Sequence, residues 1–169
     1  MYVVYITMLV GLTSLAVLSD IIRDKVPNYL IVIGLVVGCI YHIMTYGVIG
    51  IAYYLLGVIT PTLTLFLLYV IKALGAGDIK LLSMLGGIIG LKGVLWCMFY
   101  SFILGGIISI FILLYNRNFL SRIKSAFFYF QRLFIYRSFA PYERGGKEST
   151  IHFTIPILIS VMIYIGGYY

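Results

Sequence analysis

The sequence predicts an all-α membrane protein, a six-helix transmembrane bundle with a short fourth helix and a basic amphipathic cytoplasmic segment. Of the 169 residues, 63% are hydrophobic and only 10% are charged, a composition typical of helical membrane proteins. The apolar residues form runs of about the length that crosses a bilayer. The basic residues lie in the loops between these runs, which indicates membrane topology and contact with anionic lipid rather than binding to nucleic acid.

The length fits one domain, 1–169, with no room for a second soluble domain. The N-terminus is apolar and has no basic region before it, so we expect a retained first span rather than a removed signal peptide. Cys39 and Cys97 both lie inside apolar runs and have no partner at metal-ligand spacing. We therefore expect neither a metal site nor a disulfide.

The first three spans are separated by short polar turns. The first, at about 2–19, ends at Asp20. Pro27 and Asn28 suit the start of the next helix, because proline lacks the N–H that would be unpaired there. The second span covers about 29–46, and a short turn leads to the third, at about 51–71.

The fourth span, at about 79–91, is only ~13 residues or ~20 Å long, which is short for a full crossing. Ser83, Gly86, Gly87 and Gly90 give it a small-residue face that lets another helix approach closely. We therefore expect a short helix packed inside the bundle. A fifth span follows at about 93–115.

Residues 116–150 form the one long polar region. Apolar residues recur within it at spacings of three and four, and basic residues surround them. This pattern predicts a helix lying in the membrane surface in contact with lipid, and a docking site for a partner is the alternative. The sixth span follows at about 151–167.

The loop charges predict the orientation. With six crossings, only Lys92 of the 12 lysines and arginines falls on one side, so the other side is expected to face the cytoplasm and both termini to lie outside. All five acidic residues share the cytoplasmic side. Two crossings separate Asp20 from Asp78, so both carboxylates are expected at the same membrane face.

Asp78 follows two glycines at the edge of an apolar run. Placing an acidic side chain against hydrocarbon costs about a few kcal/mol, so an acid at this position is expected to be functional. Two carboxylates at one face can share a proton. The ionised one then takes a proton from water while its partner donates to a substrate carbonyl. This is peptide hydrolysis without a metal, a cofactor or a covalent intermediate. The alternative is that the glycines form a plain turn and Asp78 caps the helix that follows.

The neighbours of Asp78 have their own expected roles. Gly75 and Gly77 can adopt backbone angles that other residues avoid, and they let an extended substrate come close. Lys80 either orients a substrate carbonyl or extends its ammonium to the membrane interface.

Asp24 is the rival of Asp20 as the second carboxylate. It lies in a turn between two basic residues, where a solvated ion pair is expected, whereas Asp20 directly ends an apolar span. Asp20 is therefore the predicted partner of Asp78. His152 lies near the same face and His42 near the outer end of the second span, and we expect neither at the site.

Two motifs resemble those of the type IV prepilin peptidases. Asp20 through Val26-Pro27-Asn28 is similar to the Asp-x5-(Ile/Leu/Val)-Pro-(Asn/Asp) element of that family. The stretch Gly75-Ala76-Gly77-Asp78-Ile79-Lys80 resembles its Gly-x-Gly-Asp-x-Lys motif, and Phe153-Thr154-Ile155-Pro156 is a weaker match to its final-span pattern. The resemblance implies a single transmembrane aspartyl peptidase domain in which Asp20 and Asp78 are catalytic. The supporting residues it implies are Gly75, Gly77, Lys80, Pro27 and Asn28.

The resemblance also implies the substrate. Prepilins and pilin-like precursors of prokaryotes carry a short basic leader that is cut before an apolar helix at the cytoplasmic face of the cell membrane. Many members of the family also methylate the new N-terminus, using a large insertion after the first span. Here only the short turn 20–28 follows that span, so the chain is similar to the protease-only branch and no methylation is expected.

A small ion or proton transporter, using Asp20 and Asp78 as intramembrane ligands, is the alternative from another class. Placement of both acids at one face, rather than near the midplane, argues against it. A non-catalytic scaffold is a third interpretation. The sequence does not specify the oligomeric state.

Overall fold

The computed structural model describes residues 2–71, 73–115 and 152–167. Short connections join the successive helices up to residue 115, and the described part of the chain contains no strand. The helices are α1 (Tyr2–Arg23), α2 (Asn28–Tyr46), α3 (Ile49–Val70), α4 (Ala76–Tyr115) and α6 (Thr154–Gly167). The all-α fold class is therefore confirmed.

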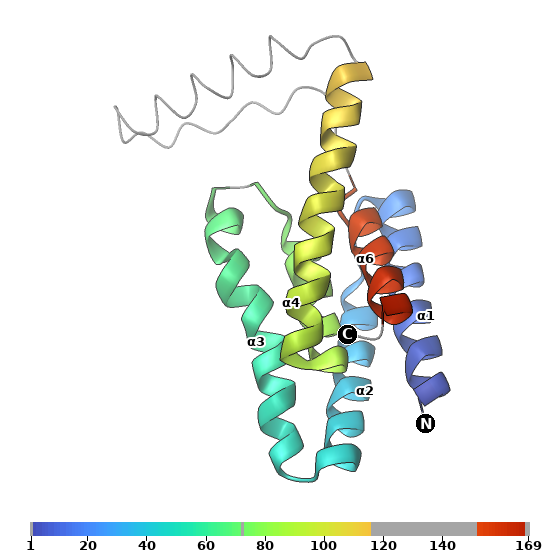
Figure 1. The fold of residues 1–169 in the computed structure, drawn as a ribbon, viewed down its shortest axis with the longest axis vertical. Coiled ribbons are helices and arrows are strands. Elements are labelled where there is room, and N and C mark those ends of the chain that lie inside the picture. Colours follow the sequence, from blue (N-terminus) through green and yellow to red (C-terminus); the bar gives the residue numbers. More distant parts are fainter. Residues whose placement is uncertain (1, 72, 116–151, 168–169) are drawn as a thin grey trace. The chain divides into compact units, whose positions relative to one another are not determined.

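The chain divides into two compact units. The first comprises Met1–Leu104 together with His152–Tyr169, and the second comprises Gly105–Ile151. In the first unit, α1 packs against α6 and against α2, and α2 packs against α3 (Figure 1). Both aspartates selected from the sequence belong to this first unit.

Within the described residues, α1, α2, α3 and α4 are long and apolar enough to cross a membrane, and α6 is apolar but shorter. The helices thus suit a multi-pass membrane protein, whereas the predicted count of six crossings is not confirmed. The spans predicted at 79–91 and 93–115 are both contained in the 40-residue α4, which is interrupted at Gly90. The φ of 77° and ψ of 178° at Gly90 favour glycine. The predicted amphipathic segment, 116–150, lies outside the described residues.

The part of α4 before Gly90 lies inside the bundle, as its small-residue face predicts. Leu81, Leu82 and Leu85 are fully buried there. By contrast, α3 carries exposed apolar side chains such as Leu63 and Leu67. Exposed side chains of this kind suit a lipid environment, which does not penalise apolar surface as water does.

Helices α2 and α3 approach α4 closely at four glycines, Gly38, Gly57, Gly86 and Gly87, which we call the packed middle. A Cβ added to Gly57 of α3 would meet the carbonyl oxygen of Gly86 of α4, and the reverse is also true. A Cβ added to Gly38 of α2 would meet the carbonyl oxygen of Gly87. Small residues allow this close backbone approach, which is a main source of helix association in lipid.

The turn from α1 to α2 is closed by hydrogen bonds. The Asp24 N–H donates to the Asp20 carbonyl at 2.8 Å, and the Ser19 hydroxyl donates to the Lys25 carbonyl at 3.3 Å. Pro27 has extended backbone, with φ of −71° and ψ of 134°, and α2 begins at the next residue. The helix start predicted at Pro27 and Asn28 is therefore confirmed.

Candidate active site

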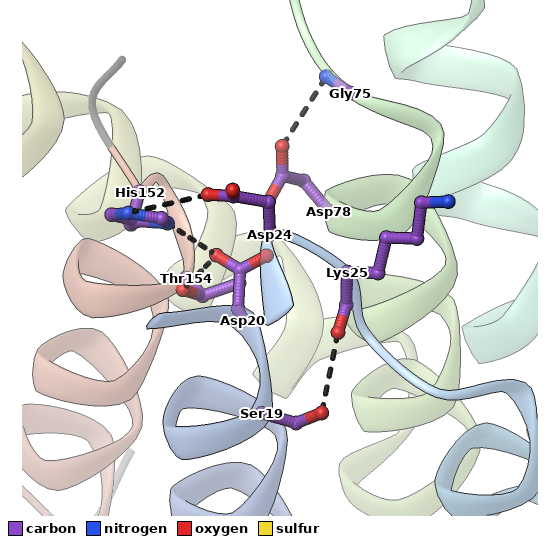
Figure 2. Close-up of polar contacts among 8 residues, drawn as sticks. All are labelled: Ser19, Asp20, Asp24, Lys25, Gly75, Asp78, His152 and Thr154. Carbon is purple, nitrogen blue, oxygen red and sulfur yellow. Dashed lines mark hydrogen bonds and ion pairs between the residues drawn. The ribbon is translucent and has the colours of Figure 1, made fainter. Parts of the chain in front are cut away.

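Asp20 lies in the last turn of α1, and the start of α6 supplies its hydrogen-bond partners. The Thr154 hydroxyl donates to Asp20 Oδ2 at 2.8 Å, and His152 Nδ1 lies 3.1 Å from the same oxygen (Figure 2). Only 14% of the Asp20 side chain is exposed. Packing of α1 against α6 brings these residues together across 134 positions of sequence.

Asp78 lies at the start of α4. The Gly75 N–H donates to Asp78 Oδ2 at 3.2 Å, so the side chain reaches back to the residue before the helix (Figure 2). This is one half of a capping box, in which the third helical residue satisfies the N–H of the capping residue. The alternative that Asp78 caps a helix following it is therefore met only in part, because α4 already begins at Ala76 and Asp78 lies inside its first turn. The contact with Gly75 occupies only one carboxylate oxygen and leaves room for a second role.

The structure brings the two selected aspartates together. Asp78 lies within electrostatic range of both Asp20 and His152 (Figure 2). No hydrogen bond joins the two carboxyl groups in the described part of the chain. We call Asp20, Asp78, His152 and Thr154 the carboxylate cluster.

Two members of the carboxylate cluster, His152 and Thr154, were missed by sequence reasoning. His152 was expected away from the site, and Thr154 was noted only as part of a weak motif. A signal existed, because His152 is one of only two histidines and falls on the same predicted side as the acids. What the sequence did not contain was the pairing of α6 with α1.

Asp24 has a different environment from Asp20. Its side chain is 78% exposed, and its φ of 53° places it in the left-handed region at the end of α1. Its closest charged neighbour among the described residues is His152, with Nε2 at 4.0 Å from Oδ1. The Asp24 side chain is therefore exposed, as expected, but the ion pair expected with its basic sequence neighbours is not formed.

Neither motif glycine is required by its backbone angle, and only Gly75 is short of space for a side chain. Within the described residues, positive φ among glycines occurs at Gly47 and Gly90, so the unusual angles expected at Gly75 and Gly77 are not found. A Cβ on Gly75 would lie 3.0 Å from Asp78 Oδ2, closer than such contacts normally are. A Cβ on Gly77 would lie 3.7 Å from the Val26 side chain, an ordinary contact.

Lys80 links the two sequence motifs. Its Nζ donates to Asn28 Oδ1 at 3.2 Å, which ties the start of α4 to the start of α2. Neither role expected for Lys80 included this contact. The described residues contain no ion pair between Lys80 and either aspartate of the carboxylate cluster.

Metal-ligating side chains do not gather in the described residues: no group of three or more histidine, cysteine, aspartate or glutamate side chains is placed to hold an ion. Cys97 is buried, and Cys39 is partly buried on α2.

Comparison with known proteins gave one family. A sequence model described as the type IV leader peptidase family matches residues 6–110, which include Asp20, Pro27, Asn28 and the stretch from Gly75 to Lys80. Neither the curated proteins nor the solved structures gave a match. Within the residues that the structure describes, four helices are able to cross a membrane, which fits a multi-pass membrane protein. The family is one of proteases that remove leader peptides. The chain belongs to the type IV leader peptidase family.

Proposed function

We propose that this protein is a membrane aspartyl endopeptidase that removes the short basic leader from type IV prepilins or pilin-like precursors. Asp20 and Asp78 are the catalytic pair. The observation that carries the proposal is the convergence of these two carboxylates, from the end of α1 and the start of α4, within electrostatic range of each other. Convergence of two acids is what hydrolysis by a shared proton requires.

The reaction starts with one carboxyl group ionised and the other protonated, because two close carboxylates do not both ionise at low cost. The ionised group takes a proton from water as the water oxygen bonds to the scissile carbonyl carbon. The other group gives its proton to the carbonyl oxygen, which forms a neutral gem-diol. No metal and no covalent enzyme intermediate takes part.

Collapse of the gem-diol restores the enzyme. The carboxyl group that took the proton from water passes it to the amide nitrogen, and the carbon–nitrogen bond breaks. A hydroxyl proton of the gem-diol returns to the other carboxylate. The products are a new carboxyl terminus on the leader and a free amine on the mature subunit, and both aspartates are back in their starting protonation states.

Cleavage is proposed at the cytoplasmic face of the cell membrane, with both chain termini outside. Loop charge supports this orientation, since the basic residues concentrate on the side that holds the acids. The products are proposed not to be N-methylated by this chain. The connection between α1 and α2 supports that proposal, because α1 ends at Arg23 and α2 begins at Asn28, without the insertion that methylating relatives carry.

The test is cleavage of a purified prepilin by the detergent-solubilised protein. Asp20→Asn and Asp78→Asn should each reduce cleavage by about a thousandfold or more, because each removes a group that transfers protons in the reaction. Asp24→Asn is the matched control. It removes an exposed carboxylate from the same turn and should retain most activity. Retained cleavage by either of the first two variants, with both folded, contradicts the proposal.

A further inference from the structure

The two carboxyl groups of the carboxylate cluster have unequal hydrogen-bond partners. Asp20 Oδ2 has the Thr154 hydroxyl at 2.8 Å and His152 Nδ1 at 3.1 Å. Asp78 Oδ2 has one backbone N–H, that of Gly75, at 3.2 Å. Two side-chain groups therefore serve one oxygen of Asp20, whereas a single, longer backbone bond serves Asp78.

Donors of this kind favour the ionised form of a carboxyl group. A carboxylate that accepts several hydrogen bonds is stabilised as the anion, and a nearby imidazolium stabilises it further. When two acids share one proton, the proton resides on the acid whose anion is less stabilised. Of the two anions, that of Asp78 has the fewer hydrogen-bond partners among the described residues.

We propose that Thr154 and His152 are positioning residues that hold Asp20 as the ionised carboxylate, the group that takes the proton from water, while Asp78 starts the reaction protonated. This inference rests on the proposed function and assigns the two proton-transfer roles within it. Both side chains act through Asp20 Oδ2, so Oδ1 of Asp20 is left to face the reacting water. In the described part of the chain no hydrogen bond to that atom is recorded.

The charged groups around Asp20 come from three elements. Asp24, after α1, faces the other ring nitrogen of His152 at 4.0 Å. Asp78 approaches from α4 and interacts with both Asp20 and His152. The His152 ring thus lies between two carboxyl groups, with Asp20 at Nδ1 and the exposed Asp24 farther away at Nε2.

A purely structural role for the same contacts is the alternative, since they also fasten α6 to α1. The two interpretations differ in the pH dependence of catalysis. Loss of a donor from Asp20 makes its anion less stable, so the acidic limb of the kcat/KM profile should move to higher pH. A mere loss of packing lowers the amount of folded protein and leaves the limb in place.

The central experiment measures kcat, KM and the pH profile of prepilin cleavage by the full chain in detergent. Thr154→Val keeps the shape of the buried side chain and removes its hydroxyl. It should lower kcat by about tenfold to a hundredfold, leave KM within about twofold, and shift the acidic limb upward by about one pH unit. Thr154→Ser, which restores the donor, should recover most of the rate and the original limb.

Two further variants control this result. Ser160→Ala also removes a buried hydroxyl from α6, but that hydroxyl bonds to Ser101 rather than to an acid. It should leave the acidic limb at the wild-type position. His152→Ala changes a partly exposed side chain and should move the limb in the same direction as Thr154→Val, which tests the assignment even if the buried substitution fails to fold.

The outcomes separate this inference from the proposed function. If Asp20→Asn and Asp78→Asn abolish cleavage but Thr154→Val and His152→Ala keep the wild-type limb, the protease proposal stands and the assignment of roles is wrong. If Thr154→Ser is no better than Thr154→Val, the hydroxyl is not the operative group. If Asp20→Asn still cleaves, both the proposed function and this inference fail.

Discussion

The packed middle and the carboxylate cluster join different helices of the first unit, and they do so by different means. In the packed middle, the backbones of α3 and α4 meet with only glycine hydrogens between them. In the carboxylate cluster, Asp20 of α1 is joined to the start of α6 by its contacts with the side chains of His152 and Thr154. Close backbone contact of the first kind is a main source of helix association in lipid, whereas contacts of the second kind also place polar groups beside one another. We therefore expect the packed middle to stabilise the fold and the side chains of the carboxylate cluster to be available for chemistry.

The largest expected effect on stability is at Gly57. Gly57→Ala places a Cβ against the Gly86 carbonyl, so α3 and α4 have to separate. We expect a loss of about 1–3 kcal/mol in the free energy of unfolding, from overpacking. Thermal unfolding in detergent measures it.

Gly11→Ala is the control, because a Cβ on Gly11 of α1 meets nothing within 4 Å. It should leave the melting temperature unchanged or raise it, since alanine favours helix over glycine by about 1 kcal/mol. Equal losses for both variants would show that the close approach of α3 and α4 does not secure the fold.

The chain's two histidines sharpen the comparison. His42 of α2 is 5% exposed, and neither ring nitrogen has a hydrogen-bond partner among the described residues. Replacing such a group by an apolar side chain is neutral or favourable by about 1 kcal/mol, because a buried unpaired polar group is costly. His42→Leu should therefore keep both cleavage and the melting temperature, or raise the latter. Loss of cleavage in a folded His42→Leu protein would contradict the assignment of chemistry to the carboxylate cluster alone.

Gly75 tests the space around Asp78. The Cβ of Gly75→Ala would lie 3.0 Å from Asp78 Oδ2, so the carboxyl group has to move by a few tenths of an ångström. A displaced reacting group lowers kcat/KM, here by about tenfold. Gly77→Ala places its Cβ at an ordinary 3.7 Å from Val26 and should cost less. The reverse order would mean that backbone freedom, not space, makes these residues glycine.

The smallest expected effect is at Asn28. Its bond to Lys80 is exposed, so Asn28→Ala should cost about 0.5 kcal/mol of stability and keep cleavage within about twofold. Lys80→Met, which removes the other partner, should behave the same way. A much larger loss of cleavage for Lys80→Met alone would assign that ammonium to the substrate.

The all-α class could be predicted, and the two aspartates could be selected as candidates, because both signals are local. Asp20 and Asp78 stand out because the chain has only five acidic residues. An apolar run ends just before Asp20, and another begins just after Asp78. The contacts of Thr154 and His152 with Asp20 could not be predicted, because they depend on which helices pair across 132 or more positions. Spacing along a sequence specifies the faces of a helix but not its neighbour.

The glycines show the same limit. The stretch from Gly86 to Gly90 predicts close helix approach, which the structure bears out at Gly86 and Gly87. The sequence does not distinguish Gly90, where the backbone leaves the helical region, from the others. The non-helical backbone at Gly90 separates two helices within α4, close to the boundary predicted between the spans at 79–91 and 93–115.

The most direct test of the central claim compares Asp20→Asn and Asp78→Asn with the double variant in single-turnover cleavage of a prepilin. Groups that act as a unit lose little more when both are removed than when either is removed. We predict residual rates within about threefold of one another for the three variants. A double variant whose loss is the product of the two single losses would show that the carboxylates act independently and would contradict the shared-proton mechanism.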